Sequence, residues 1–124
     1  MDYTFPKYEH LKGRKEVTEV FEKGVSIVNF PIRALYFVTE EAAQAKILVA
    51  ASKKLFKKAV SRNYCKRLLR EAYRLNKQTI TEKIKDKNYG INIAFSYIDK
   101  EKEDFFKISE KISQILNKIV VSLP

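Results

Sequence analysis

The sequence predicts an α+β protein, an α/β sandwich with the element order α-β-β-β-α-β-α and a mixed sheet of about four strands. Apolar residues repeat at helical spacing in three separate segments, and runs rich in β-branched and aromatic residues lie between them. The 124 residues, 45% of them hydrophobic, are enough for one domain with a substantial core. We therefore expect a single domain over residues 1–124, with an ordered core at about 9–120.

The N-terminal half is predicted to form the first helix and three strands. EHLKGRKEVTEVFEKG, residues 9–24, predicts a helix, and Gly24 suits the position after its end. The apolar residues of this helix are Leu11, Val17, Val20 and Phe21. The strand candidates are VSIVNF and IRALYFVTE, separated by Pro31, and AKILVAAS, which follows a polar turn candidate. We expect these consecutive strands to be antiparallel, because their connections are short.

The C-terminal half alternates between helical and strand spacing. From about Ala59 the spacing is helical, and near Asn88 it returns to that of a strand in YGINIAFSY. DKEKED, residues 99–104, is interpreted as a solvated turn. The last helix is predicted in EDFFKISEKISQILNKIV, and its apolar face comprises Phe105, Ile108, Ile112, Ile115, Leu116 and Ile119.

The positive charge is concentrated in one segment of a chain with a formal net charge of +10. Residues 1–52 contain seven basic and seven acidic residues, and residues 78–124 contain eight and seven. Residues 53–77, KKLFKKAVSRNYCKRLLREAYRLNK, contain ten basic residues and one acid, Glu71. Because such a concentration costs self-repulsion, it indicates a polyanionic partner, and nucleic acid is the leading candidate.

A helical wheel divides residues 62–77 into two faces. The side expected to pack on the sheet comprises Tyr64, Cys65, Leu68, Leu69, Ala72 and Leu75. The opposite side comprises Arg62, Lys66, Arg67, Arg70, Arg74 and Lys77. Solvated helix faces usually mix charges, because like charges at i,i+4 cost roughly 0.2–0.5 kcal/mol per pair. The unbroken basic side therefore favours binding to a polyphosphate over simple solvation.

Several other classes of function lack support in the sequence. No apolar run approaches the roughly 18 to 20 residues of a membrane helix, and no secretory signal is recognised, so we expect a cytoplasmic protein without membrane contact. A lone cysteine, Cys65, excludes an internal disulfide and is interpreted as a small core residue. With one histidine, His10, and no acidic cluster beside the basic helix, we predict neither a catalytic residue nor a metal site. Charge alone does not distinguish DNA from RNA.

The segment SKKLFKKAVSRNYCKRLLREAYRLN, residues 52–76, resembles the signature of the bacterial ribonuclease P protein family, which ends in RNR-x-KR-L-x-RE-x-F/Y-R. EVFEKG, the Leu-Tyr pair in IRALYFVTE and YGINIAF are also similar to family motifs, so the resemblance spans about residues 9–120. The family has the same order of elements, in a fold like the second domain of a small-subunit ribosomal protein. Tyr64 stands where the family has the second Arg of RNR, and Val17 stands where it commonly has Phe.

This resemblance implies a protein that holds RNA while another subunit cuts it. The expected partners are the ribonuclease P catalytic RNA and precursor tRNA, and no DNA partner is expected. The holoenzyme is an endonuclease that removes the 5′ leader of precursor tRNA with Mg²⁺, which is held mainly by RNA. Two other hypotheses stay open, a structural RNA-binding protein such as a ribosomal component and a protein-only nuclease.

By resemblance, one set of residues is expected to contact RNA. The set comprises Lys53, Lys54, Lys57, Lys58, Arg62, Asn63, Lys66, Arg67, Arg70 and Arg74. Lys57, Lys58 and Arg74 could instead act by diffuse electrostatic steering, and Asn63 could be only a helix cap.

The resemblance also implies a cleft for the leader at Phe21, Tyr36 and Val17. The rings of Phe21 and Tyr36 could stack on unpaired bases, or they could be ordinary core aromatics. Val17 could supply packing but not stacking.

Overall fold

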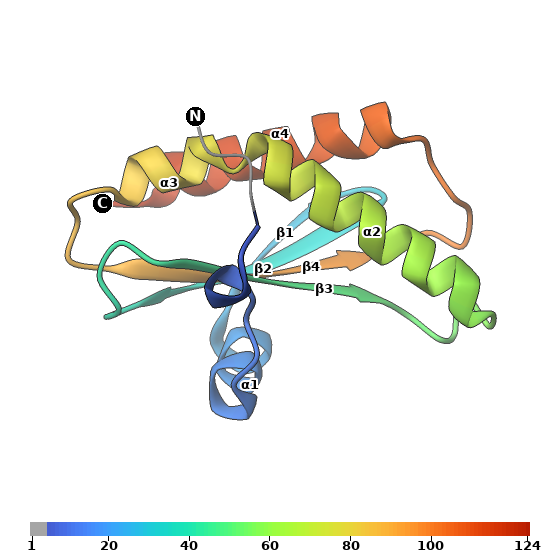
Figure 1. Ribbon diagram of the computed structural model, residues 1–124, viewed down its shortest axis with the longest axis horizontal. Coiled ribbons are helices and arrows are strands. Elements are labelled where there is room, and N and C mark those ends of the chain that lie inside the picture. Colours follow the sequence, from blue (N-terminus) through green and yellow to red (C-terminus); the bar gives the residue numbers. More distant parts are fainter. Residues whose placement is uncertain (1–4) are drawn as a thin grey trace.

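Four strands form one mixed sheet, and helices cover both of its faces (Figure 1). The computed structural model describes residues 5–124, so the first four residues of the expected domain lie outside the described part of the chain. The elements are η1 (Lys7–Glu9, a 3-10 turn), α1 (Arg14–Lys23), β1 (Val25–Asn29), β2 (Ile32–Thr39), β3 (Ala45–Ala51), α2 (Ala59–Asn76), α3 (Gln78–Ile84), β4 (Gly90–Tyr97) and α4 (Phe105–Ser122). The predicted fold class is confirmed, with α3 as a further helix after α2.

The strand order in the sheet is β1-β2-β4-β3. β1 and β2 form the antiparallel hairpin that their short connection predicts. β2 and β3, in contrast, do not pair, because β4 lies between them, antiparallel to β2 and parallel to β3. Parallel neighbours need a long crossover connection, which α2 and α3 supply. The central position of β4 explains its nearly continuous apolar sequence, since both of its faces are buried.

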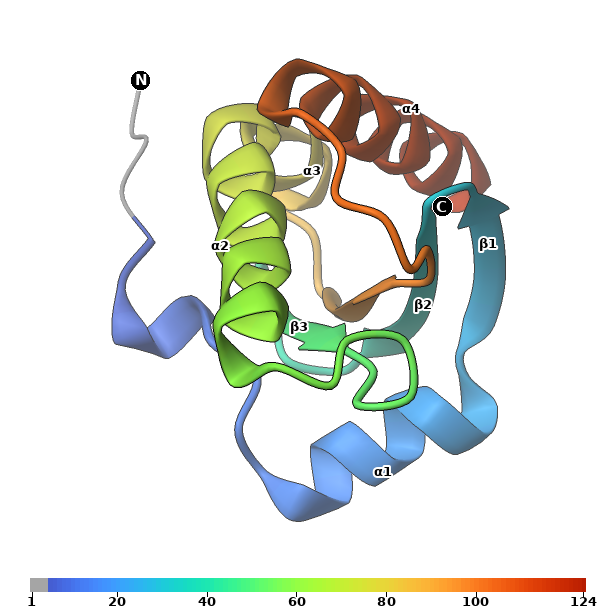
Figure 2. The same cartoon turned by 90° about the vertical axis from the view of Figure 1, so that its right-hand side faces the viewer.

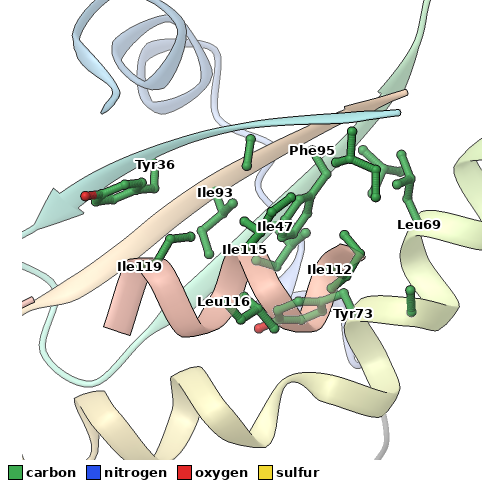
Figure 3. Close-up of a cluster of buried hydrophobic side chains, with 14 of the residues drawn as sticks. Tyr36, Ile47, Leu69, Tyr73, Ile93, Phe95, Ile112, Ile115, Leu116 and Ile119 are labelled. Atoms are coloured by element: carbon green, nitrogen blue, oxygen red, sulfur yellow. The ribbon is translucent and has the colours of Figure 1, made fainter. Parts of the chain in front are cut away.

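The sheet separates a large core from a small one. The large core lies between the sheet and helices α2, α3 and α4, and its side chains include Ile93, Phe95 and Ile115 (Figure 3). The small core, on the side of α1, consists of Leu11, Val20, Leu35 and Ala94. Successive residues of a strand point to opposite faces, so the neighbours Leu35 and Tyr36 belong to different cores.

The N-terminal segment, residues 5–11, lies along the edge of β3 and beside α2 (Figure 2). The amide of Leu11 donates to the carbonyl oxygen of Ile47 at 2.9 Å. The ring of Phe5 lies 5.6 Å from the ring of Tyr73 on α2, centroid to centroid. The Glu9 carboxylate accepts two hydrogen bonds from Lys77 Nζ, at 2.9 and 3.2 Å. The segment thus covers an exposed sheet edge and fixes the C-terminal end of α2.

Gly24 follows α1 as predicted, but its conformation does not require glycine. Its φ is −68°, which any residue can adopt. A Cβ atom at this position would collide with the carbonyl oxygen of Val20 and lie 3.2 Å from that of Tyr36. The absence of a side chain therefore permits the chain to leave α1 close to the carbonyl groups of Val20 and Tyr36.

The buried ion pair between Glu9 and Lys77 predicts a large effect of one substitution. Glu9→Gln should lower the free energy of unfolding by about 3 kcal/mol, because it removes the carboxylate that faces a buried ammonium group. The side chains of Lys77 and Glu9 are 5% and 13% exposed. Glu41→Gln, which breaks the more exposed pair with Lys46, is the control and should cost at most about 1 kcal/mol. Equal losses in urea unfolding would contradict the assignment.

Candidate nucleic-acid interface

The basic segment begins as a loop that is anchored at both ends. The carbonyl oxygen of Ser52 accepts a hydrogen bond from the amide of Phe56, and its hydroxyl accepts one from the amide of Lys54, both at 3.0 Å. The Phe56 side chain is buried in the large core. The loop exposes Lys53, Lys54, Lys57 and Lys58. These four positive charges therefore project from an anchored loop.

The buried face of α2 differs in part from the predicted one. Its buried residues are Cys65, Leu68, Leu69, Ala72 and Tyr73. Four of these five were predicted, but Tyr73 was not. Tyr64 and Leu75, which were predicted to be buried, are 37% and 40% exposed.

The N-terminal segment explains why the buried face is rotated. Phe5 covers Tyr73 from one side, and Phe95 of β4 lies 6.1 Å away, between ring centroids. Glu9 in the same way binds Lys77, which is 4% exposed and does not belong to the basic face on which the wheel placed it. A helical wheel shows only the helix itself, so it could not predict that residues 5–11 cover one flank of α2.

Two of the arginines on α2 are bound within the chain. Nη1 of Arg62 donates to the carbonyl oxygens of Phe56 and Lys57, at 2.8 and 3.0 Å. Nη2 of Arg74 donates to Glu71 Oε2 at 2.7 Å. Arg62 and Arg74, both on the predicted basic side of the helix, therefore have internal partners, and Arg62 also fixes the loop that carries the lysines.

The outward-facing centre of α2 comprises Asn63, Lys66, Arg67 and Arg70. Asn63, Arg67 and Arg70 are exposed, and Lys66 is half-buried. Within residues 5–124, no ion pair or hydrogen bond engages the side chains of the three cations. Lys58, not Asn63, occupies the N-cap position of α2, so the capping interpretation of Asn63 is wrong.

Three other positive charges lie where they destabilise α2 in the free protein. Lys57, Lys58 and Arg62 lie at the N-terminal end of α2, whose first turn contains no acid. The helix dipole is positive at that end, so each cation there costs about 0.3–1 kcal/mol at most. A bound anion would reverse the sign of this interaction.

Two cations outside the basic segment lie beside it, and sequence reasoning missed both. Lys12 lines a cleft of about 100 Å³ together with Arg70 and His10. Nζ of Lys102 lies 5.2 Å from the centroid of the Tyr64 ring. Lys102 belongs to DKEKED, which was interpreted as a solvated turn. Neither contact leaves a local sequence signal, because each depends on how distant segments fold together.

The three residues of the expected leader cleft do not lie on one surface. Val17 is half-buried against the small core, and Phe21 is 46% exposed on the same helix. Tyr36 points into the opposite, large core (Figure 3). Its hydroxyl lies 2.7 Å from Ser122 Oγ on α4. Successive residues of a strand point to opposite faces of the sheet, so Tyr36 faces away from α1 when Leu35 faces toward it. The Tyr36 ring, 7% exposed, is therefore unavailable for stacking, whereas Phe21 is not an ordinary core aromatic.

The remaining candidate groups show no reactive arrangement. Cys65 is fully buried, and burial raises the pKa of its thiol. No three His, Cys, Asp or Glu side chains within residues 5–124 are grouped so that they could hold a metal ion. No helix in the same part of the chain is long and apolar enough to cross a membrane.

A helix that packs on a mixed sheet and presents its cations outward is typical of a small α+β protein that binds nucleic acid. The family model for Ribonuclease P matches residues 5–120. The chain therefore belongs to the bacterial ribonuclease P protein family. It is a subunit of the ribonuclease P holoenzyme, and it assists the processing of the 5′ leader of precursor tRNA.

Relatives match nearly the whole chain. The ribonuclease P protein component of Porphyromonas gingivalis is 37% identical over 120 residues, which cover 95% of this chain and 88% of the relative. That of Clostridioides difficile is 31% identical, and the match covers 96% and 98% of the two chains. The solved ribonuclease P protein of Thermotoga maritima has a TM-score of 0.68 at 26% identity, over 89% of this chain and 96% of that one. The Staphylococcus aureus protein, at 21% identity and a TM-score of 0.69 over 91% and 96%, supports the fold alone.

The internal bonds of Arg62 predict that basic residues on α2 differ in their effect on stability. Arg62→Ala should lower the free energy of unfolding by about 2 kcal/mol, because it removes hydrogen bonds from a charged donor to two carbonyl groups. Arg67→Ala with Arg70→Ala should change it by no more than about 0.5 kcal/mol. Urea unfolding measures both. A double variant as unstable as Arg62→Ala would show that the outward face is misplaced.

Proposed function

We propose that α2 and the loop before it bind the phosphates of the ribonuclease P RNA. The proposed RNA-binding surface comprises Lys53, Lys54, Lys57, Lys58, Asn63, Lys66, Arg67 and Arg70. The observation that carries the proposal is the outward cluster of Lys66, Arg67 and Arg70, which have no internal partner among the described residues. Phosphate contacts of this kind fix register and make affinity dependent on salt. Arg62 and Arg74, which have internal partners, contribute charge to the same surface.

We infer that the leader of precursor tRNA contacts the side of the sheet that carries α1. Phe21 offers an exposed aromatic face there, and stacking on an unpaired base is worth roughly 1–3 kcal/mol without regard to sequence. Val17 and the half-buried Phe37 pack against the small core on the same side of the sheet. Phe37 is the aromatic residue of β2 on this face, in place of the predicted Tyr36.

We infer that the holoenzyme works with Mg²⁺ and that the RNA holds the ion. Mg²⁺ is commonly bound through phosphates and retained waters, which a folded RNA supplies. The contribution of this chain is to lower the repulsion between phosphate groups with its own positive charge.

The test is a processing assay with the RNA subunit transcribed in vitro. The wild-type protein should stimulate leader removal at moderate magnesium, and the RNA-free protein should cleave nothing. Arg67→Ala with Arg70→Ala should weaken RNA binding and reduce the slope of log K against log salt by about 1.4–1.8, at roughly 0.7–0.9 per phosphate contact. Lys85→Ala with Lys87→Ala removes the same charge from an exposed loop after α3 and should leave the slope nearly unchanged.

Three outcomes would contradict the proposal. The first is a failure of the wild-type protein to stimulate the RNA. The second is metal-dependent cleavage by the RNA-free protein, which would favour a protein nuclease. The third is an equal effect of the two double variants, which would mean that overall charge, and not this surface, sets the affinity.

Phe21 predicts a separate defect in leader binding. Phe21→Ala should weaken binding of precursor tRNA to the holoenzyme by about fivefold or more, because it removes a stacking surface. Binding of mature tRNA should not change. Phe106→Ala, an exposed aromatic on α4 across the sheet, is the matched control and should have no effect. Equal effects on precursor and mature tRNA would argue against a leader contact.

A further inference from the structure

Lys102 and Tyr64 form a contact at the border of the proposed RNA-binding surface. Nζ of Lys102 lies 5.2 Å from the centroid of the Tyr64 ring, a distance at which a cation is attracted to an aromatic face. The ring is 37% exposed and precedes Arg67 by three residues, so it lies on the same side of α2. Lys102 itself is exposed. A positive charge from a distant loop thus lies beside α2 at Tyr64.

The loop that carries Lys102 is fixed from the core. The hydroxyl of Tyr97, at the end of β4, donates to the carbonyl oxygen of Glu101 at 2.8 Å and accepts from the amide of Glu103 at 2.8 Å. The Tyr97 side chain is 1% exposed. These two bonds hold the residues on both sides of Lys102, so the backbone of Lys102 is fixed before any ligand binds.

Three of the four acids of the same loop are engaged elsewhere, and the fourth, Glu101, is exposed. Residues 99–104 contain four acidic and two basic residues, and an acidic loop beside α2 would repel phosphate. Asp104 accepts from the amide of Lys107 at the start of α4, and Glu103 pairs with the Lys107 ammonium at 3.5 Å. Asp99 accepts from the amide of Glu101 within the loop. Lys102 is the charged side chain that the loop presents to Tyr64.

We propose that Lys102 binds a phosphate group. It supplies, from the 99–104 loop, a positive charge next to the position on α2 that is occupied by the uncharged Tyr64. The inference rests on the proposed RNA-binding function of α2. The family signature has an arginine where this chain has Tyr64, and the aromatic ring here holds a cation that comes from another part of the chain. The ligand is a phosphate group of the RNA, because an ammonium group contacts phosphate as a compact point charge.

The test compares two lysines of one loop in binding to the in vitro transcribed ribonuclease P RNA. Lys102→Gln should weaken binding several-fold and reduce the slope of log K against log salt by about one. Lys100→Gln removes the same charge two residues away and is the matched control, with a much smaller expected change in slope. Tyr64→Phe keeps the ring and should bind like the wild type.

A rescue experiment tests whether the charge of Lys102 acts at the position of Tyr64. Tyr64→Arg places a cation on α2 itself, so the double variant Tyr64→Arg with Lys102→Gln should recover the wild-type affinity and slope. Equal effects of Lys102→Gln and Lys100→Gln, or no rescue by Tyr64→Arg, would overturn the assignment of Lys102 while the wild-type protein still binds. Failure of the wild-type protein to bind the RNA would overturn the proposed function as well.

Discussion

The contact of the N-terminal segment with α2 determines which side of the basic helix faces solvent. Phe5 covers Tyr73, and the Glu9 carboxylate binds a lysine at the end of the helix, so this flank of α2 is closed. The buried face extends toward Tyr73 and leaves Tyr64 on the other flank partly exposed. Arg67 and Arg70 lie on the opposite side of the helix and point outward, as the helical wheel predicted. A segment far from the basic motif in sequence thus closes one flank of the helix that is proposed to bind RNA.

Most of the fold could be predicted from local patterns, and what could not has a common physical origin. The change from helical to strand spacing near Asn88 indicates β4, and the periodicity after Ala59 indicates α2. The sequence does not reveal that β4 separates β2 from β3, since pairing depends on where a crossover returns to the sheet. It also does not indicate α3, which continues the helical pattern of α2 after a short break.

The candidate site, too, could be predicted only in part from local sequence. The motif in residues 52–76 was enough to indicate the family and the charged helix. It could not distinguish a cation that faces solvent from one with an internal partner, because Arg62 and Lys66 have the same charge pattern around them but different neighbours in space. The buried position of Tyr36 depends on strand register, and the place of Lys102 depends on the buried hydroxyl of Tyr97.

The position of β4 in the sheet has a consequence for the order of folding. β4 is the last strand to be synthesised, yet it lies between β2 and β3, which are made much earlier. Pairings between segments so distant in sequence form slowly, because the intervening chain must first be ordered. The hairpin of β1 and β2 can form early, because its strands are adjacent in sequence, whereas the sheet beneath α2 is complete only after β4 has been made and inserted between β2 and β3.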